Sequence, residues 1–96
     1  MILRERRTAE GLLVAVCDDE VLGETFENGE VSLTVNEEFY GGEEVGEEDV
    51  IESLSRAQVA NIVGTRAVEV AVEAGIIDDD YVLDVGGTRH AQLVRI

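Results

Sequence analysis

The stretch that decides the fold is Ala57–Gly75, AQVANIVGTRAVEVAVEAG, the longest run of this chain in which apolar residues dominate. Its pattern predicts a helix with a narrow polar stripe and a wide apolar face, which suits packing against a sheet. The stripe consists of side chains spaced by three and four residues: Arg66, Glu69 and Glu73. Gly64 interrupts the run, so the sequence is compatible with one kinked helix or with two abutting helices. Gly75 is a suitable end, because glycine adopts a left-handed conformation at little cost.

Strands are predicted on the N-terminal side of this stretch. Gly11–Cys17, GLLVAVC, is apolar on both faces and is therefore expected to be a central strand. Met1–Arg6 alternates in polarity, as expected for a half-exposed strand near a sheet edge. Val31–Val35 has one polar face and is predicted to be a further strand.

Two shorter helices are predicted between these elements. The acids Asp18–Glu20 favour a helix start through capping and the helix dipole. The buried side of that helix would consist of Val21, Leu22 and Phe26. Asn28-Gly29 then indicates a turn. Glu47–Asp49 opens the second helix, whose inward side chains would be Val50, Ile51 and Leu54.

Residues 36–49 form the least ordinary segment, because Phe39-Tyr40-Gly41-Gly42 lies in a strongly acidic run. One interpretation is a solvated loop whose two aromatic side chains pin it to the core. The alternative is a mobile flap, hinged at the glycines, that closes over a pocket.

Residues 81–96 are predicted to form a hairpin around Gly86-Gly87-Thr88. A three-residue loop places the apolar side chains on one face and sets Asp84 opposite His90 on the other. A turn of the two glycines alone would instead pair Asp84 with Arg89. The hydrophobic pattern favours the three-residue loop.

Together these elements predict an α+β fold in a single small domain, residues 1–96. Strands cluster at both ends of the chain. They are therefore expected to meet in one mostly antiparallel sheet, with two to three helices packed on one side. We find no internal repeat and no linker in the sequence.

The composition is strongly acidic: 22 acidic residues face 7 basic ones, all of them arginine, for a formal net charge of −15. Concentrated salt relieves the resulting self-repulsion, because the Debye length falls to about 3 Å at 1 M. Two interpretations remain open: a solvated surface adapted to a salt-rich cytoplasm, or an acidic face that docks a basic partner. Free nucleic acid matches the acidic surface poorly, since phosphate contacts need clustered Lys or Arg.

The chain has one cysteine, which excludes an internal disulfide. We recognise no signal-peptide pattern in the sequence and no apolar run near about 20 residues. We therefore expect a cytoplasmic protein that does not enter a membrane.

Four segments, in this order, resemble a known family: LLVAVCDDEVLGETFENGE (12–30), EEFYGG (37–42), AQVANIVGTRAVEVAVEAGII (57–77) and VGGTRHAQLVRI (85–96). They are similar to the small archaeal family named domain of unknown function 424, over nearly the whole chain. The resemblance implies an archaeal cytoplasmic protein with a compact α+β domain. The family has no established activity, so the resemblance transfers no functional residue. A proline usually precedes the histidine of the last motif, and Arg89 stands there in this chain.

The residue types of a thiol nucleophile with its base and orienting carboxylate are present: Cys17, His90 and Asp84 or Asp18. A helix start after Cys17 would lower the thiol pKa, whereas the adjacent acids would raise it. A lone cysteine at the end of an apolar strand is otherwise a small buried hydrophobic residue. No motif ties Cys17 to His90, so their proximity depends on the fold.

The glycine-rich hairpin is the preferred candidate binding site. Its glycines let backbone N–H groups point outward, and Arg89 with His90 adds positive charge for a phosphate or a carboxylate. Arginines of the first strand, if they lie nearby, would complete a basic patch: Arg4, Arg6 and Arg7. The alternative is a hairpin loop in which glycine supplies positive φ. The predicted binding residues are Gly86, Gly87, Arg89, His90, Gln92, Tyr40 and Asn61.

No residues have the spacing of a zinc or calcium site, so neither a metal nor a cofactor is predicted. The leading hypothesis is a non-enzymatic binding or accessory module for an anionic ligand, an RNA or a protein partner. One alternative is a small enzyme that uses Cys17 and His90. Another is a homodimer, built through a strand edge, without a small-molecule site.

We expect the free energy of unfolding to rise with added salt, because screening weakens the repulsion among the 22 acidic residues. Thermal unfolding followed by circular dichroism from low to molar potassium chloride measures this. Sucrose, which stabilises proteins without screening charge, is the control cosolute. A melting temperature that stays flat across the salt series contradicts the prediction.

Overall fold

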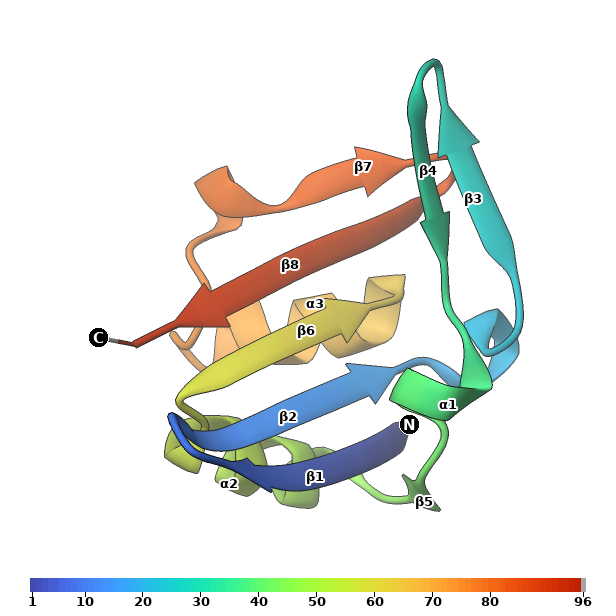
Figure 1. Ribbon diagram of the computed structural model, residues 1–96. Helices are drawn as coiled ribbons and strands as arrows, with labels where there is room; N and C mark the ends of the chain where they lie inside the picture. The colour runs from blue at the N-terminus through green and yellow to red at the C-terminus, as the bar shows by residue number, and fades with distance from the viewer. Residues whose placement is uncertain (96) are drawn as a thin grey trace.

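The computed structural model describes residues 1–95, and its frame is a six-stranded sheet with the strand order β5-β1-β2-β6-β8-β7 (Figure 1). The strands of the sheet are β1 (Ile2–Thr8), β2 (Gly11–Cys17), β5 (Glu43–Glu44), β6 (Val59–Val63), β7 (Leu83–Val85) and β8 (Thr88–Val94). The remaining elements are the hairpin of β3 (Thr25–Asn28) and β4 (Val31–Thr34) and the helices α1 (Glu37–Tyr40), α2 (Glu47–Arg56) and α3 (Thr65–Glu73). Short 3-10 turns cover Asp19–Val21 and Asp79–Tyr81. Ile96, the predicted end of the last strand, lies outside the described residues.

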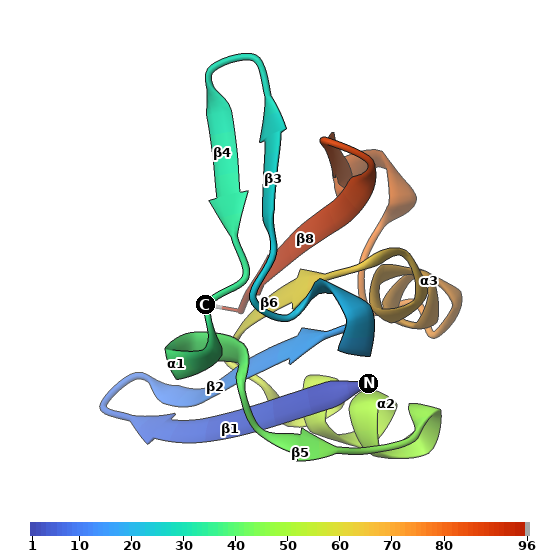
Figure 2. The same ribbon diagram turned by 90° about the vertical axis from the view of Figure 1, so that its right-hand side faces the viewer.

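The α+β prediction is confirmed, and the sheet is mostly antiparallel. Only β2 and β6 run parallel among the paired strands of residues 1–95. Helices α2 and α3 cover one face of the sheet, as predicted (Figure 2). The four-residue helix α1 and the β3–β4 hairpin lie on the opposite face, so the sheet is a middle layer.

The main correction concerns Ala57–Gly75, whose first half is strand β6 and not helix. Val59, Ile62 and Val63 are β-branched, and such residues lose rotamer freedom in a helix. Every residue of this segment pairs with β2 on one side and with β8 on the other, and this pairing decides its conformation. The helix predicted from the periodicity is correct only for the part that forms α3. Gly64 is the junction between strand and helix and not a kink within a helix.

Strand β2 is central, as its apolar sequence predicts. On one face Val14 and Val16 pack in a cluster with Leu54 of α2. On the other face Cys17 belongs to a second cluster that includes Tyr40 of α1. A strand buried on both faces has no room for an alternating polar pattern.

The segment after Cys17 differs from the predicted short helix. A 3-10 turn covers Asp19–Val21, and Phe26 then lies in β3 opposite Leu33 of β4. Both side chains pack against the second core cluster, so strand pairing buries them better than a helix would. The predicted turn at Asn28-Gly29 is confirmed, as is the helix that begins at Glu47.

The β7–β8 hairpin has the two-residue turn, so the preferred three-residue loop is wrong. Val85 pairs with Thr88, and Asp84 pairs with Arg89. Gly86 and Gly87 have φ angles of +53° and +94°, the positive values that a tight hairpin turn requires. Tyr81 lies in the preceding 3-10 turn and not in a strand.

One buried carboxylate joins the parallel strands to α3. Asp18 follows β2, is only 5% exposed, and donates its backbone N–H to the Val63 carbonyl at 3.0 Å. Its side chain accepts hydrogen bonds from the backbone N–H groups of Arg66 (3.0 Å) and Ala67 (2.8 Å). These are among the first N–H groups of α3, which no residue within the helix can satisfy. Gly64 makes room, because a Cβ there would overlap the Asp18 carboxylate.

We expect Gly64→Ala to destabilise the fold by more than the roughly 1–3 kcal/mol that a strained φ alone costs. The added Cβ both strains a φ of +116° and displaces the Asp18 carboxylate from α3. Urea unfolding measures the loss. Gly23→Ala is the matched control, since its φ is +88° and nothing lies within 4 Å of the added Cβ. Equal losses in the two variants would show that the carboxylate contact is unimportant.

Candidate functional site

The residues predicted to bind a ligand are divided between the two faces of the sheet. His90 pairs with Val63 of β6, which pairs with Cys17 of β2, and directly opposed residues share a face. Gln92 pairs with Asn61 on that same face. Because side chains alternate along a strand, Arg89 points to the opposite face from His90.

The structure does not assemble the thiol site. Val63 stands between Cys17 and His90, and two strand spacings put their backbones roughly 10 Å apart. The Cys17 side chain is 0% exposed, and burial raises the pKa of its thiol to about 11, with the acids beside it acting in the same direction. Asp84 pairs with Arg89 and thus faces away from His90. Cys17 is a packed core residue in this geometry.

The glycine turn is packed and its arginine is already paired. A Cβ on Gly86 would lie 2.6 Å from the carbonyl oxygen of Glu27, so the turn fits closely against β3. Arg89 contacts carboxylates of Asp79 at 2.9 Å and of Asp84 at 3.7 Å. The predicted basic patch does not form, because β2 and β6 separate the β1 arginines from β8.

The acidic segment with the two aromatic residues is anchored. Tyr40 is buried, and its ring meets that of Phe39 edge-on with centroids 5.0 Å apart. Gly41 approaches the Glu37 carbonyl and Gly42 approaches the Leu3 carbonyl so closely that a Cβ would overlap either oxygen. Tyr40 therefore anchors α1 to the core. This agrees with the interpretation in which the aromatic side chains hold the segment to the core, and not with a mobile flap.

Part of the sheet face that carries α1 and the β3–β4 hairpin is left uncovered. We call it the open sheet face and define it by Leu13, Val59, Asn61, Gln92 and Val94. Val94 is 64% exposed. The amides of Asn61 and Gln92 are joined by a hydrogen bond of 2.9 Å, donated by Gln92 Nε2. Sequence reasoning found the two amides but missed the three apolar residues beside them.

On this side of the sheet the described residues of β1, β2, β6 and β8 include no carboxylate, and Glu44 of β5 lies at the outer edge beside Ile2. Two lateral rows, each formed by directly paired residues, cross β1, β2, β6 and β8 on this face. They are Arg4, Ala15, Asn61 and Gln92 in one row and Arg6, Leu13, Val59 and Val94 in the other. A chain with 22 acidic residues among 96 thus keeps all of them off these rows.

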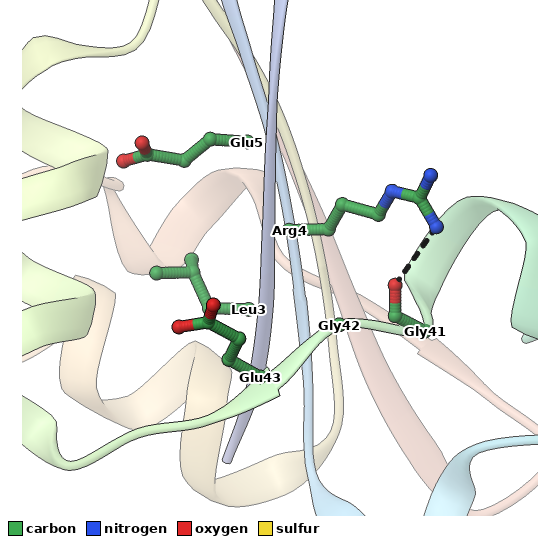
Figure 3. Close-up of a pocket in the computed structure, with 6 residues that line it drawn as sticks. All are labelled: Leu3, Arg4, Glu5, Gly41, Gly42 and Glu43. Atoms are coloured by element: carbon green, nitrogen blue, oxygen red, sulfur yellow. Dashed lines mark hydrogen bonds between the residues drawn. The ribbon is translucent and has the colours of Figure 1, made fainter.

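Two hollows border the sheet. One, of about 250 Å³, lies at the β1–β2 turn and shares Leu13 and Val59 with the open sheet face. The other, of about 420 Å³, lies along the outer edge of β1 (Figure 3). It is lined by Leu3, Arg4, Glu5, Gly41, Gly42 and Glu43.

Within residues 1–95, no group of three or more His, Cys, Asp or Glu side chains is placed to hold a metal ion. The helices in that range are also too short or too polar to cross a membrane.

His90 has a buried Nε2 atom without a hydrogen-bond partner among the described residues, and burial lowers the pKa of its imidazole. A depressed pKa means that the folded state binds fewer protons than the unfolded chain below the ordinary value of 6.5. The stability that neutral His90 contributes is present above that pH and is lost as pH falls through the folded-state pKa.

We therefore expect His90→Gln to lose less stability than the wild type on acidification. Urea unfolding of both proteins at about pH 7.5 and about pH 5.5 measures the two losses. Carboxylates titrate in both proteins, so the difference between the two losses isolates His90. Equal losses would contradict the expected burial of the neutral imidazole.

Comparison with known proteins agrees with the fold and supplies no activity. The model of the family "Protein of unknown function (DUF424)" matches residues 5–96. The crystal structure of an uncharacterized conserved protein from Methanopyrus kandleri is similar, with a TM-score of 0.79 and 25% sequence identity over 96% of this chain and 88% of that chain. No curated protein matches the chain. The resemblance seen in the sequence is confirmed, and the chain belongs to the DUF424 family of proteins of unknown function.

Proposed function

We propose that this protein is a non-enzymatic binding module that docks a protein partner on the open sheet face. The observation that carries the proposal is the absence of carboxylates from that face among the described strand residues of a chain with net charge −15. Interface cores of protein complexes are depleted in charged residues in the same way.

The chemistry of the open sheet face suits a protein surface. Leu13, Val59 and Val94 form an apolar row across three strands, and apolar area gains free energy when a partner removes it from water. Asn61 and Gln92 keep donor and acceptor capacity beyond the bond they share, since each amide has more hydrogen-bonding positions than one contact uses. Those positions can orient a partner.

Nucleic acid is the weaker occupant of this face. Arg6 donates to the carbonyl oxygens of Phe39 (3.0 Å) and Glu38 (2.6 Å), and Arg4 donates to the carbonyl oxygen of Gly41 at 3.2 Å. These guanidinium groups are partly used by α1, and the rest of the chain repels phosphate. The glycine turn is likewise a weaker anion site, because Arg89 is paired with acids.

The acidic remainder of the surface would then serve solubility and orientation. A partner that approaches an acidic face must strip water from carboxylates, which is costly. The open sheet face avoids that cost, so the charge distribution itself directs docking. The proposal places the protein in a salt-rich cytoplasm, in keeping with 22 acids and no lysine.

We expect Val94→Glu to weaken partner binding at least about tenfold, because a carboxylate buried without a counter-charge opposes docking. Immobilised wild type and variant are exposed to extract of the native cells in molar salt, and retained proteins are quantified by mass spectrometry. The retained partner is then purified and titrated by calorimetry. Val31→Glu is the control, since Val31 is 56% exposed at the hairpin tip, away from the open sheet face. A partner whose affinity falls with Val31→Glu and not with Val94→Glu binds elsewhere and contradicts the proposal.

A further inference from the structure

The outer edge of β1 is only partly covered. Strand β5 pairs with Ile2 and Leu3 alone, and no other strand of residues 1–95 pairs with β1 on that side. The backbone from Arg4 to Thr8 is thus an open strand edge, which is a template for another chain. This edge is independent of the open sheet face, which is built from side chains of β2, β6 and β8.

Glu5 and Arg7 present the unpaired backbone groups of this edge. The Met1 carbonyl accepts a hydrogen bond from Val45 at 2.8 Å, and Leu3 pairs with Glu43, so residues 1 and 3 face outward. Outward and inward residues alternate along a strand, which turns the N–H and C=O groups of Glu5 and Arg7 outward as well.

A hollow lies beside Glu5 at this edge. After α1 the chain crosses the edge at Gly42, which approaches the Leu3 carbonyl too closely for any side chain. The hollow of about 420 Å³ lies along β1 from Leu3 to Glu5, next to the segment that crosses at Gly42 (Figure 3). Figure 3 shows Arg4 and Glu5 pointing to opposite sides of β1, so neither side chain blocks the edge itself.

We propose that β1 of a second copy of this chain adds antiparallel to this edge and makes a two-fold dimer with one continuous sheet. The charge of β1 favours a second copy as the occupant. Strand β1 carries three arginines and one glutamate, in a chain whose net charge is −15. Copies that repel each other elsewhere meet at this edge along a strand with more arginines than acids. The edge at β7 is shorter, three residues, and contains Asp84.

The register follows from the outward groups. Hydrogen-bonded pairs of an antiparallel ladder consist of residues that both face the partner, so Glu5 and Arg7 must pair with Glu5 or Arg7 of the second copy. Glu5 opposite Arg7 joins opposite charges twice, once on each side of the axis. A shift of two residues would place Glu5 opposite Glu5 or Arg7 opposite Arg7, which like charges disfavour.

Of the two charges in this register, Glu5 already has partners within its own copy. Arg7 makes no ion pair with the residues that the structure describes, whereas Glu5 accepts from Ser53 at 2.5 Å and from Arg56 at 2.7 Å. The two-fold axis passes beside Arg6 of both copies. Their guanidinium groups do not meet, because each is held over its own Phe39 ring, with 4.9 Å from Cζ to the ring centroid.

A cysteine crosslink tests the register directly. Residue 6 lies on the axis in a pair without direct hydrogen bonds, where Cα atoms are about 4.5 Å apart and a disulfide fits. We expect Arg6→Cys to form a covalent dimer on mild oxidation in molar salt. Thr8→Cys alone forms no covalent dimer, but it crosslinks with Arg4→Cys when the two are mixed. The native Cys17 is buried and does not react.

A charge exchange provides the second measurement, because Arg6→Cys also removes hydrogen bonds to α1. Glu5→Arg and Arg7→Glu each place like charges opposite one another, so light scattering should give each the mass of a monomer. Mixed in equal amounts they restore both opposite-charge pairs, and the dimer mass returns. Val94→Glu leaves the wild-type dimer intact, which separates this proposal from docking on the open sheet face. A wild type that scatters as a monomer in molar salt, or mixed variants that stay monomeric while the wild type is dimeric, overturns the proposal.

Discussion

The fold depends on the carboxylate of Asp18. It follows β2, reaches across to the start of α3, and accepts the backbone N–H groups of Arg66 and Ala67 in a buried site. Its own N–H is bonded to Val63, the last residue of β6. The parallel strands and the helix are thereby joined at one point, and the helix dipole favours the negative charge there. Burial raises the pKa of Asp18, and the N–H donors oppose that shift.

Much of the fold was predictable because local pattern and tertiary position agree. Gly11–Cys17 is apolar on both faces and lies at the sheet centre, and α2 begins at the predicted acids. The failure at Val59–Val63 has a physical cause. Its apolar residues run directly into the helical pattern of α3, and a five-residue apolar run fits either structure. Pairing between β2 and β8 decides the outcome, and a single sequence does not display that pairing.

The candidate site was predictable residue by residue but not as a surface. Asn61, His90 and Gln92 were identified, and the pairing of β6 with β8 puts them on one face. Arg89 was expected beside them, but it shares a face with Asp84. The carboxylate-free rows were present in the sequence as alternate residues of separate strands. They became visible as one surface once the registers were known.

The two proposed surfaces reinforce each other through the geometry of a sheet. Directly opposed residues of an antiparallel pair point to the same side, so a dimer through β1 places Arg6 of both copies on one side. The open sheet face lies on that side as well, since Arg6 is in the same lateral row as Leu13 and Val59. Both open faces of a dimer therefore point the same way. A partner with two equivalent sites would engage both, and the second contact would be intramolecular and correspondingly stronger. Dense surface charge opposes weak contacts elsewhere, and the two proposed contacts lie where carboxylates are absent or paired.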